Sequence, residues 1–199
     1  HLMRWGVMGC ASIFFALEGY IYLESPDTNT PLVISHRGVS NKNGVQNTVQ
    51  SLEKTAQLKP DLVEMDVQET KDGQFVMMHD ANLKSLARIN ATPQDLTLDE
   101  LTNTDIYENG YQTKISSFDD YLERANALNQ KLLIEIKTSK KDSPQMMDHF
   151  LEKYGATIKK YGHQMQSLDY HVIDKVLAYD SEIPVYFILP YNSVFPRTK

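Results

Sequence analysis

Short apolar segments alternating with helix-spaced segments are the feature that most constrains the fold of this chain. The segment Lys131–Lys137 is the clearest example, because after its first residue it is apolar on both faces except at Glu135 and Lys137. A strand with two apolar faces is typical of a parallel sheet that is covered on both sides. Parallel strands also need a crossover connection, usually a helix, between them. The sequence therefore predicts an α/β fold with parallel strands.

The remaining elements follow the same alternation along the chain. The predicted strands are short apolar runs, namely Leu32–Ser35, Asp61–Val67, Gln74–His79, Lys131–Lys137, His163–Leu168 and Pro184–Leu189. The predicted helices have apolar residues at helical spacing and are Thr48–Leu58, Leu96–Leu101, Ser117–Asn129, Gln145–Tyr161 and Leu168–Ala178. In the second helix, Thr97 stands three residues before Glu100, which is the spacing of a capping box.

The first 24 residues differ from the rest of the chain. Arg4 is followed by an uncharged run, Trp5–Leu17, which Glu18 interrupts. A full membrane span needs about 20 mostly apolar residues. We predict an apolar helix over residues 1–24 that forms the end of a transmembrane segment, and a polar linker at 25–30. A signal sequence with Arg4 as its basic part, or a buried or swapped apolar helix, are the alternatives.

Charge and cysteine content exclude several classes of protein. The chain has 20 Lys plus Arg against 26 Asp plus Glu, a formal net charge of −6. A broad nucleic-acid-binding surface needs a basic face, so no nucleic-acid partner is expected. The single cysteine, Cys10, excludes an intramolecular disulfide framework and a cysteine-based zinc cluster.

Carboxylates occur in pairs with charged neighbours on two predicted strands. Glu64 and Asp66 are two residues apart and point to the same face, as do Glu135 and Lys137. Such spacing usually marks a solvated face, but the surrounding residues here are apolar on both faces. Inward-facing charges at the end of a buried parallel strand are typical of a barrel's catalytic mouth. Three carboxylates meeting there would suit a hard cation, Ca²⁺ or Mg²⁺.

Histidines stand at the ends of two of the predicted strands. A lone histidine is more often structural than catalytic, but His36 stands beside Arg37 and Gly38 immediately after a buried strand. Arg37 carries a guanidinium fork that matches phosphate, and an imidazole can transfer a proton near neutral pH. His79, followed by Asp80, supplies a second imidazole in an equivalent position. The pattern indicates chemistry on an anionic substrate.

Taken in order, these motifs resemble those of the glycerophosphodiester phosphodiesterase family. The resemblance runs from about Pro31 to Pro190 and rests on His36-Arg37-Gly38, Asn47-Thr48, Glu64-x-Asp66, Thr70-Lys71-Asp72-Gly73, His79-Asp80, Glu135-x-Lys137 and Gln166-Ser167-Leu168-Asp169. Each motif alone is weak, whereas the ordered set is specific.

The resemblance implies a TIM-type (β/α) barrel and metal-dependent hydrolysis of glycerophosphodiesters to glycerol 3-phosphate and an alcohol. It further implies that three carboxylates hold one divalent cation, Ca²⁺ or Mg²⁺. Two histidines would act as general acid and base, and two basic side chains would bind the phosphate. By position, the metal ligands would be Glu64, Asp66 and Glu135, the catalytic pair His36 and His79, and the phosphate-binding residues Arg37 and Lys137. The resemblance is strongest to membrane-attached members, which implies a location at the cell membrane. Because Arg4 precedes the apolar run, we expect that end to be cytoplasmic and the barrel to lie on the extracytoplasmic side.

The chain departs from the family pattern in two respects. Gln46 occupies the position where the family usually has a glutamate before Asn47-Thr48. Residues 31–199 are also too few for a complete barrel of about 250 residues, so we expect about five of eight strands and a chain truncated at its C-terminus. Two rival functions stay open: a non-catalytic metal- or glycerophosphate-binding module, and a related phospholipase acting on intact phospholipid.

Overall fold

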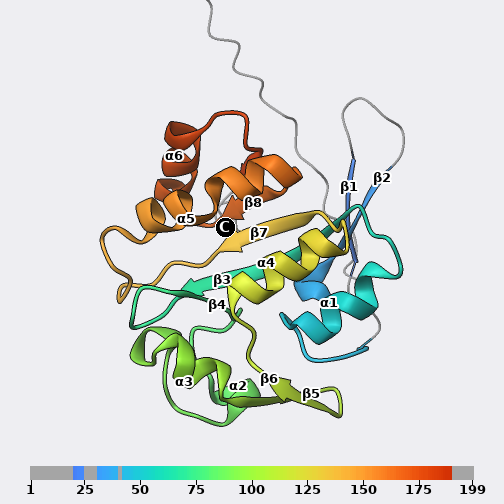
Figure 1. Ribbon diagram of the computed structural model, residues 1–199, viewed down its shortest axis with the longest axis vertical. Helices are drawn as coiled ribbons and strands as arrows, with labels where there is room; N and C mark the ends of the chain where they lie inside the picture. The colour runs from blue at the N-terminus through green and yellow to red at the C-terminus, as the bar shows by residue number, and fades with distance from the viewer. Residues whose placement is uncertain (1–19, 25–30, 40–41, 190–199) are drawn as a thin grey trace, which may run out of the picture.

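A sheet of parallel strands with helices on its outer side forms the main body of the chain (Figure 1). The computed structural model describes residues 20–24, 31–39 and 42–189. The sheet has the order β1-β2-β3-β7-β8-β9, with β4 paired to β3. The strands are β1 Tyr20–Glu24, β2 Pro31–Ser35, β3 Leu62–Glu69, β4 Phe75–Met77, β7 Leu132–Ile136, β8 Gln164–Ser167 and β9 Val185–Phe187.

Five of these strands, β2, β3, β7, β8 and β9, are parallel and neighbour one another in chain order. A helix precedes each return to the sheet: α1 Val49–Ala56, α4 Phe118–Ala127, α5 Met146–Tyr161 and α6 Tyr170–Tyr179. Sequential parallel strands joined by helices are the repeating unit of a (β/α) barrel. The prediction of an incomplete barrel with about five strands is confirmed within the described residues.

The main core lies between the sheet and helices α4 and α5. Ser117 begins α4, because its side chain accepts a hydrogen bond from the Asp120 amide at 3.0 Å. The apolar face of α4 then packs on α5, where the Phe118 ring stacks on Phe150 at 5.3 Å and meets Tyr154 edge-on at 4.7 Å. This aromatic cluster fixes the outer side of β3 and β7, so that their polar side chains face the opposite side.

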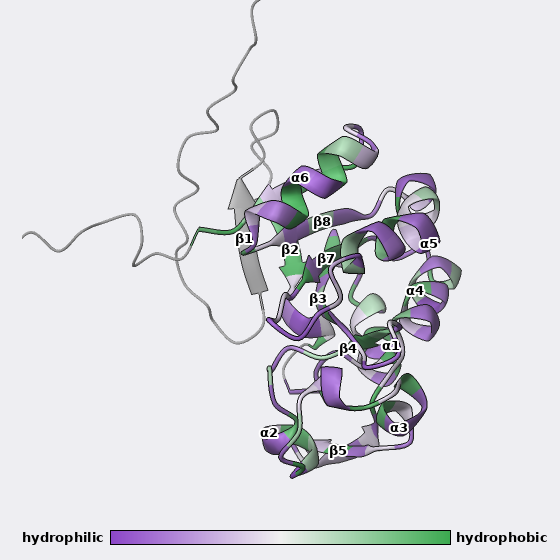
Figure 2. Ribbon diagram, turned by 90° about the vertical axis from the view of Figure 1, so that its left-hand side faces the viewer, coloured by the Kyte–Doolittle hydropathy of each residue, from purple (hydrophilic) through white to green (hydrophobic). Residues whose placement is uncertain are grey.

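A small lobe interrupts the barrel between β4 and α4, at one end of the molecule in both views (Figure 1 and Figure 2). It contains α2 Lys84–Ala87, α3 Leu98–Thr102 and the hairpin of β5 Asp105–Glu108 and β6 Tyr111–Lys114. Its separate core is Val45, Val76, Met78, Leu83, Leu86, Leu101, Ile106 and Ile115. The capping box predicted from Thr97 and Glu100 is confirmed at α3.

Strand β4, whose pairing the sequence did not predict, is antiparallel to β3, because the turn at residues 71–73 is too short for a crossover. One prediction at the amino end of the chain is corrected. Residues Tyr20–Glu24, placed in an apolar helix by the sequence, form strand β1 antiparallel to β2. Their aromatic and β-branched residues favour a strand once β2 offers an edge.

The predicted membrane helix lies mainly in residues 1–19, which are outside the described part of the chain, as is the linker at 25–30. Among the residues that the structure does describe, the longest helix, α5, has 16 residues, and none is long and apolar enough to span a bilayer.

Candidate active site

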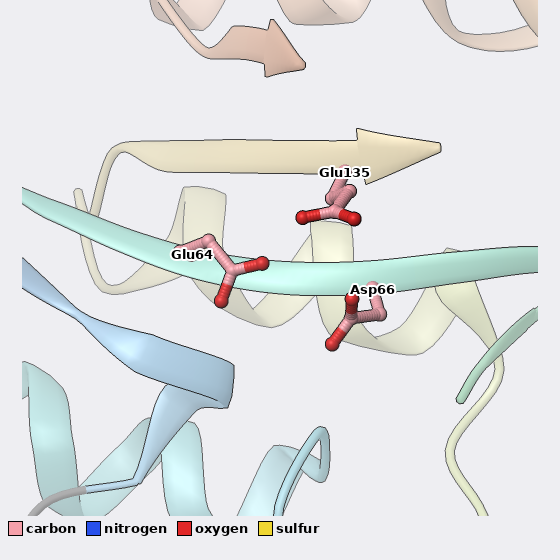
Figure 3. A group of neighbouring side chains, drawn as sticks. All are labelled: Glu64, Asp66 and Glu135. Carbon is pink, nitrogen blue, oxygen red and sulfur yellow. The ribbon is translucent and has the colours of Figure 1, made fainter. Parts of the chain in front are cut away.

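Three carboxylates meet at the carboxyl ends of the central strands. Glu64 and Asp66 lie two positions apart on β3, and Glu135 lies on the neighbouring strand β7 (Figure 3). Asp66 and Glu135 are directly paired in the parallel register. One oxygen from each of the three lies within 4.8 Å of the others. The structure therefore brings together the residues that the sequence predicted as metal ligands.

The carboxylates are buried, with Glu64 at 2%, Asp66 at 1% and Glu135 at 7% exposure. Burial, and then the charge of Asp66, raise the pKa of Glu64 well above its usual range. Asp66 Oδ1 accepts no hydrogen bond of good geometry within the described residues, although the Lys137 ammonium lies 3.3 Å from it. Three buried carboxylates beside a single ammonium are costly without further positive charge, and the oxygen-only ligand set is the one that hard divalent cations prefer. These residues fit a Ca²⁺ or Mg²⁺ ion.

Lys137 lies inside this acidic group. Its Nζ atom is 2.6 Å from Glu135 Oε1 and 3.3 Å from Asp66 Oδ1. Although burial opposes it, the charges of Asp66 and Glu135 raise the pKa of Lys137. Three carboxylates against one ammonium leave an excess of negative charge that a divalent cation would offset.

Amide side chains orient two of the carboxylates. Asn47, just before α1, donates to Asp66 Oδ2 at 3.0 Å and accepts from the Asp66 backbone amide at 3.0 Å. Gln166 on β8 donates to Glu135 Oε2 at 2.9 Å. Such contacts hold a metal ligand in one orientation. The sequence motifs contained Asn47 and Gln166, but no role was predicted for either. Each contacts a carboxylate on a different element of the fold, which the sequence does not show.

His36 and Arg37 lie in the short 3₁₀ turn His36–Gly38 that ends β2. The Arg37 backbone amide donates to Glu64 Oε2 at 2.9 Å, and His36 Nε2 is 3.9 Å from the same oxygen. Burial, followed by the Arg37 charge, lowers the pKa of His36. His36 therefore favours the neutral form, which can accept a proton, beside the acidic group.

His79 lies after β4 and contacts Arg37. His79 Nε2 is 2.8 Å from Arg37 Nη2, and its Nδ1 is 2.8 Å from Asp80 Oδ1. Gln68, which follows Asp66 at the next position on the same face of β3, supports this loop by donating to the backbone oxygens of Met78 and Asp80 at 2.9 Å. The spacing of Gln68 from Glu64 and Asp66 was a sequence signal that could have identified it.

The fold and this site define the class of protein. Buried carboxylates, two imidazoles and a guanidinium meet near the carboxyl ends of parallel barrel strands, where (β/α)-barrel enzymes have their active sites. The model of the glycerophosphoryl diester phosphodiesterase family matches residues 36–187, and the chain belongs to this family.

Proteins of several organisms are similar in sequence to parts of this chain. It is 26% identical over 171 residues to human lysophospholipase D GDPD1, covering 78% of this chain and 51% of that protein. It is 39% identical over 74 residues to a glycerophosphodiester phosphodiesterase of Caldanaerobacter subterraneus, covering 37% of this chain and 30% of that protein. The chain thus spans about half the length, or less, of these curated relatives.

Solved structures share the fold. A phosphodiesterase of Oleispira antarctica, determined with the product sn-glycerol-3-phosphate, has a TM-score of 0.67 at 22% identity, covering 80% of this chain and 67% of that one. A glycerophosphodiester phosphodiesterase of Parabacteroides distasonis has a TM-score of 0.63 at 24% identity, covering 77% of this chain and 63% of that one. Both comparisons support the barrel fold.

Proposed function

We propose that this chain hydrolyses glycerophosphodiesters, releasing glycerol 3-phosphate and an alcohol. The observation that carries the proposal is the meeting of Glu64, Asp66 and Glu135 within 4.8 Å, beside His36 and the Arg37–His79 contact. Family membership supports the same reaction class, and so does the product-bound structure of the Oleispira antarctica relative.

The three carboxylates would hold one divalent cation, Ca²⁺ or Mg²⁺. Such an ion, when bound, offsets the charge that develops on the phosphoryl oxygens. Arg37 and Lys137 add positive charge on the same side, and Arg37 can present two parallel N–H groups to a phosphate. A phosphodiester is already anionic, so this fixed positive charge favours its binding and the more highly charged transition state.

The two histidines supply proton transfer. Hydrolysis forms a bond between phosphorus and the attacking oxygen, which loses a proton, and breaks the bond to the leaving alkoxide, which gains one. His36, with its lowered pKa, is suited to accept the first proton. His79, oriented by Asp80, would deliver the second from Nε2 once that nitrogen carries a proton and no longer accepts from Arg37. Each role contributes about 10²–10⁴-fold to the rate.

The test measures glycerol 3-phosphate release from glycerophosphocholine and glycerophosphoglycerol in Ca²⁺, Mg²⁺ or EDTA. We expect release that EDTA abolishes, and turnover reduced by about 10²–10⁴-fold in His36→Ala and His79→Ala. Both variants should still bind the cation, because neither residue belongs to the acidic group. Full activity in EDTA, or in either variant, would contradict the corresponding part of the proposal.

One observation favours a second substrate class. The human relative, which covers 78% of this chain, is named a lysophospholipase D. A lysophospholipid contains the same phosphodiester with one acyl chain attached to the glycerol. Comparing glycerophosphocholine with lysophosphatidylcholine at equal concentration separates the two candidates. Faster choline release from the acylated substrate would favour lysophospholipid hydrolysis.

We also propose, as a separate point, that residues 1–19 attach the chain to the cell membrane, with the barrel on its extracytoplasmic side. Support for this comes from the apolar run Trp5–Leu17 and the basic Arg4 before it. Fractionation of cells that express the chain with and without residues 1–19 tests it, and an unchanged distribution between membrane and soluble fractions would contradict it.

A further inference from the structure

Gln46 connects the small lobe to the candidate active site. It lies in the loop before α1, and its Oε1 atom accepts a hydrogen bond from Arg37 Nη1 at 3.1 Å. On its other side, Gln46 Nε2 donates to Glu108 Oε1 at 2.6 Å, and its backbone amide donates to Glu108 Oε2 at 2.8 Å. Glu108 is the last residue of β5, 62 positions further along the chain.

The tip of the β5–β6 hairpin is firmly held against this loop. Asn109 donates from Nδ2 to the Gly44 backbone oxygen at 3.0 Å. Ile106, two residues before Glu108, and Val45, next to Gln46, are buried in the same apolar core of the small lobe. Packing and hydrogen bonds therefore both fix the position of Glu108 beside Gln46.

The donors and acceptors of Arg37 and Glu108 fix the orientation of the Gln46 amide between them. A carboxylate only accepts hydrogen bonds and a guanidinium only donates them, whereas an amide does both. Glu108 therefore turns the Gln46 NH₂ group toward itself, which leaves Oε1 facing Arg37. If the amide were reversed, its NH₂ group would meet the donors of Arg37. The charge of Glu108 thus selects the amide orientation that can hold the guanidinium.

The same geometry explains why an amide occupies position 46. A glutamate at this position would bring its carboxylate against Glu108 at the distance of a hydrogen bond, and two like charges that close repel each other. The negative charge lies instead on Glu108, one side chain further from the guanidinium. Arg37 is then oriented by a neutral oxygen rather than by a direct ion pair at this position.

We propose that Glu108 is a positioning residue that acts through Gln46 on Arg37, so that the β5–β6 hairpin sets the orientation of the phosphate-binding guanidinium. This inference rests on the proposed function for its kinetic readout. It adds to that function a link between the small lobe and the barrel, because Arg37 Nη1 is fixed by Gln46 while Nη2 contacts His79.

Single variants and an exchange of the two side chains test the proposal. The proteins are the full chain, Glu108→Ala, Gln46→Glu, and the exchanged pair Gln46→Glu with Glu108→Gln. In the exchanged pair, the amide at 108 donates to the carboxylate at 46 and its oxygen accepts from the backbone amide. Every hydrogen bond is kept, and only the bond between the two side chains has its polarity reversed. The measurements are kcat and KM for glycerophosphocholine, glycerol 3-phosphate affinity by calorimetry, and the urea midpoint.

We expect each single variant to weaken glycerol 3-phosphate affinity and kcat/KM by about 10–100-fold, the loss typical of a hydrogen bond to a charged group. The exchanged pair should recover to within about 3-fold of the original chain. Asp105→Asn is the matched control, because it removes another carboxylate from the same hairpin, one that pairs with Lys114 at the surface. It should leave both quantities unchanged.

A merely structural role would lower the urea midpoint of the single variants and leave the affinity of the folded fraction unchanged. That result, or an exchanged pair as weak as Gln46→Glu alone, would overturn the proposal. If the original chain hydrolyses no glycerophosphodiester, the proposed function fails, and glycerol 3-phosphate affinity alone decides the role of Glu108. Equal affinity in all four proteins, or none in any, would then overturn it.

Discussion

Arg37 Nη2 lies 2.8 Å from His79 Nε2, and this contact determines which nitrogen of the imidazole carries the proton. A guanidinium has only donors, so His79 Nε2 must accept the hydrogen bond. The ring proton is then on Nδ1, which donates to Asp80 Oδ1 at 2.8 Å. This arrangement puts the ring proton on the side of Asp80 and directs the Nε2 lone pair at Arg37.

Replacing Asp80 should therefore disturb the tautomer rather than the fold. In Asp80→Asn, the side-chain amide can donate to His79 Nδ1, which moves the ring proton to Nε2 and places it against Arg37. We expect kcat for glycerophosphodiester hydrolysis to fall by about 10²–10⁴-fold, as when an acid–base histidine is misoriented. Steady-state kinetics measure the effect, with circular dichroism to verify folding.

Ser85→Ala is the matched control for this prediction. Ser85 Oγ donates to the other oxygen, Asp80 Oδ2, at 2.5 Å, and this bond is the main cause of the lowered pKa of Asp80. Removing it leaves the His79–Asp80 hydrogen bond in place, so kcat should fall by less than about 10-fold. Equal rates in Asp80→Asn and the original chain would show that Asp80 does not orient His79.

The carboxylates of β3 and β7 give a prediction about metal binding. Without a cation, Glu64 and Asp66 repel each other in a buried site, so Glu64→Gln should raise the unfolding temperature of the metal-free chain. With Ca²⁺ or Mg²⁺, the original chain should gain stability with increasing concentration. The variant should need at least about 10-fold more cation for the same gain, because it lacks one anionic ligand. Thermal unfolding in EDTA and in each metal measures both effects.

Asp105→Asn is again a suitable control, since it removes a surface carboxylate outside the acidic group. Its response to the cation should equal that of the original chain. A chain whose unfolding temperature does not change with either cation would contradict the assignment of Glu64, Asp66 and Glu135 as metal ligands.

The sequence predicted the parallel part of the fold well because the evidence there is local. Strand β7 reads as apolar on both faces, and α4 has a capping serine and an apolar stripe. The carboxylates could be placed together before the structure was known, since parallel strands bring their carboxyl ends to the same side of a sheet. The same reasoning placed His36 and His79 at strand ends.

Most of the small lobe and its contacts were not predictable in this way. Within residues 83–112 only the capped helix at 96–101 was predicted, yet this range also includes α2 and most of the β5–β6 hairpin. Strand β6 is exposed or half-buried throughout, so it carries no apolar pattern. The Gln46–Glu108 hydrogen bond joins residues 62 positions apart, and a pairing of two polar side chains across that separation leaves no signal in the sequence.

Tyr121 gives a prediction about stability near the site. Its ring is fully buried, and its hydroxyl has no hydrogen-bond partner in the described part of the chain. Burial and the charges of Glu64 and Asp66 raise its pKa. Because a buried hydroxyl without a partner costs about 1–3 kcal/mol, Tyr121→Phe should increase the free energy of unfolding by about 1 kcal/mol. Urea denaturation measures this change.

A substitution at Gly38 probes the surroundings of the same Tyr121 hydroxyl. It has a φ of +65°, and a Cβ atom there would lie 2.5 Å from Tyr121 Oη. Gly38→Ala should therefore destabilise the chain, and by less when Tyr121→Phe is also present, because the phenyl ring lacks the clashing oxygen. A Tyr121→Phe variant that is less stable than the original chain would show that the hydroxyl has a stabilising partner.

His163 gives a prediction about pH. It is 1% exposed, its Nδ1 accepts from the Leu132 backbone amide at 3.1 Å, and its Nε2 faces Asn126 Oδ1 at 2.8 Å. Both bonds are made by the neutral ring. Burial, and then the charge of Lys131, lower its pKa to about 4, against an ordinary value of 6.5. The unfolded chain therefore takes up a proton on His163 before the folded chain does.

The stability that the neutral ring contributes is fully present above pH 6.5, is lost as the pH falls from 6.5 to about 4, and does not change further below that value. The loss amounts to about 3 kcal/mol. His163→Gln should be less stable than the original chain at pH 7 but should lack this part of the pH dependence. Urea unfolding at several pH values measures it, with the exposed His149→Gln as the matched control. A control that flattens the profile as much as His163→Gln would assign the pH dependence to histidines in general rather than to the buried one.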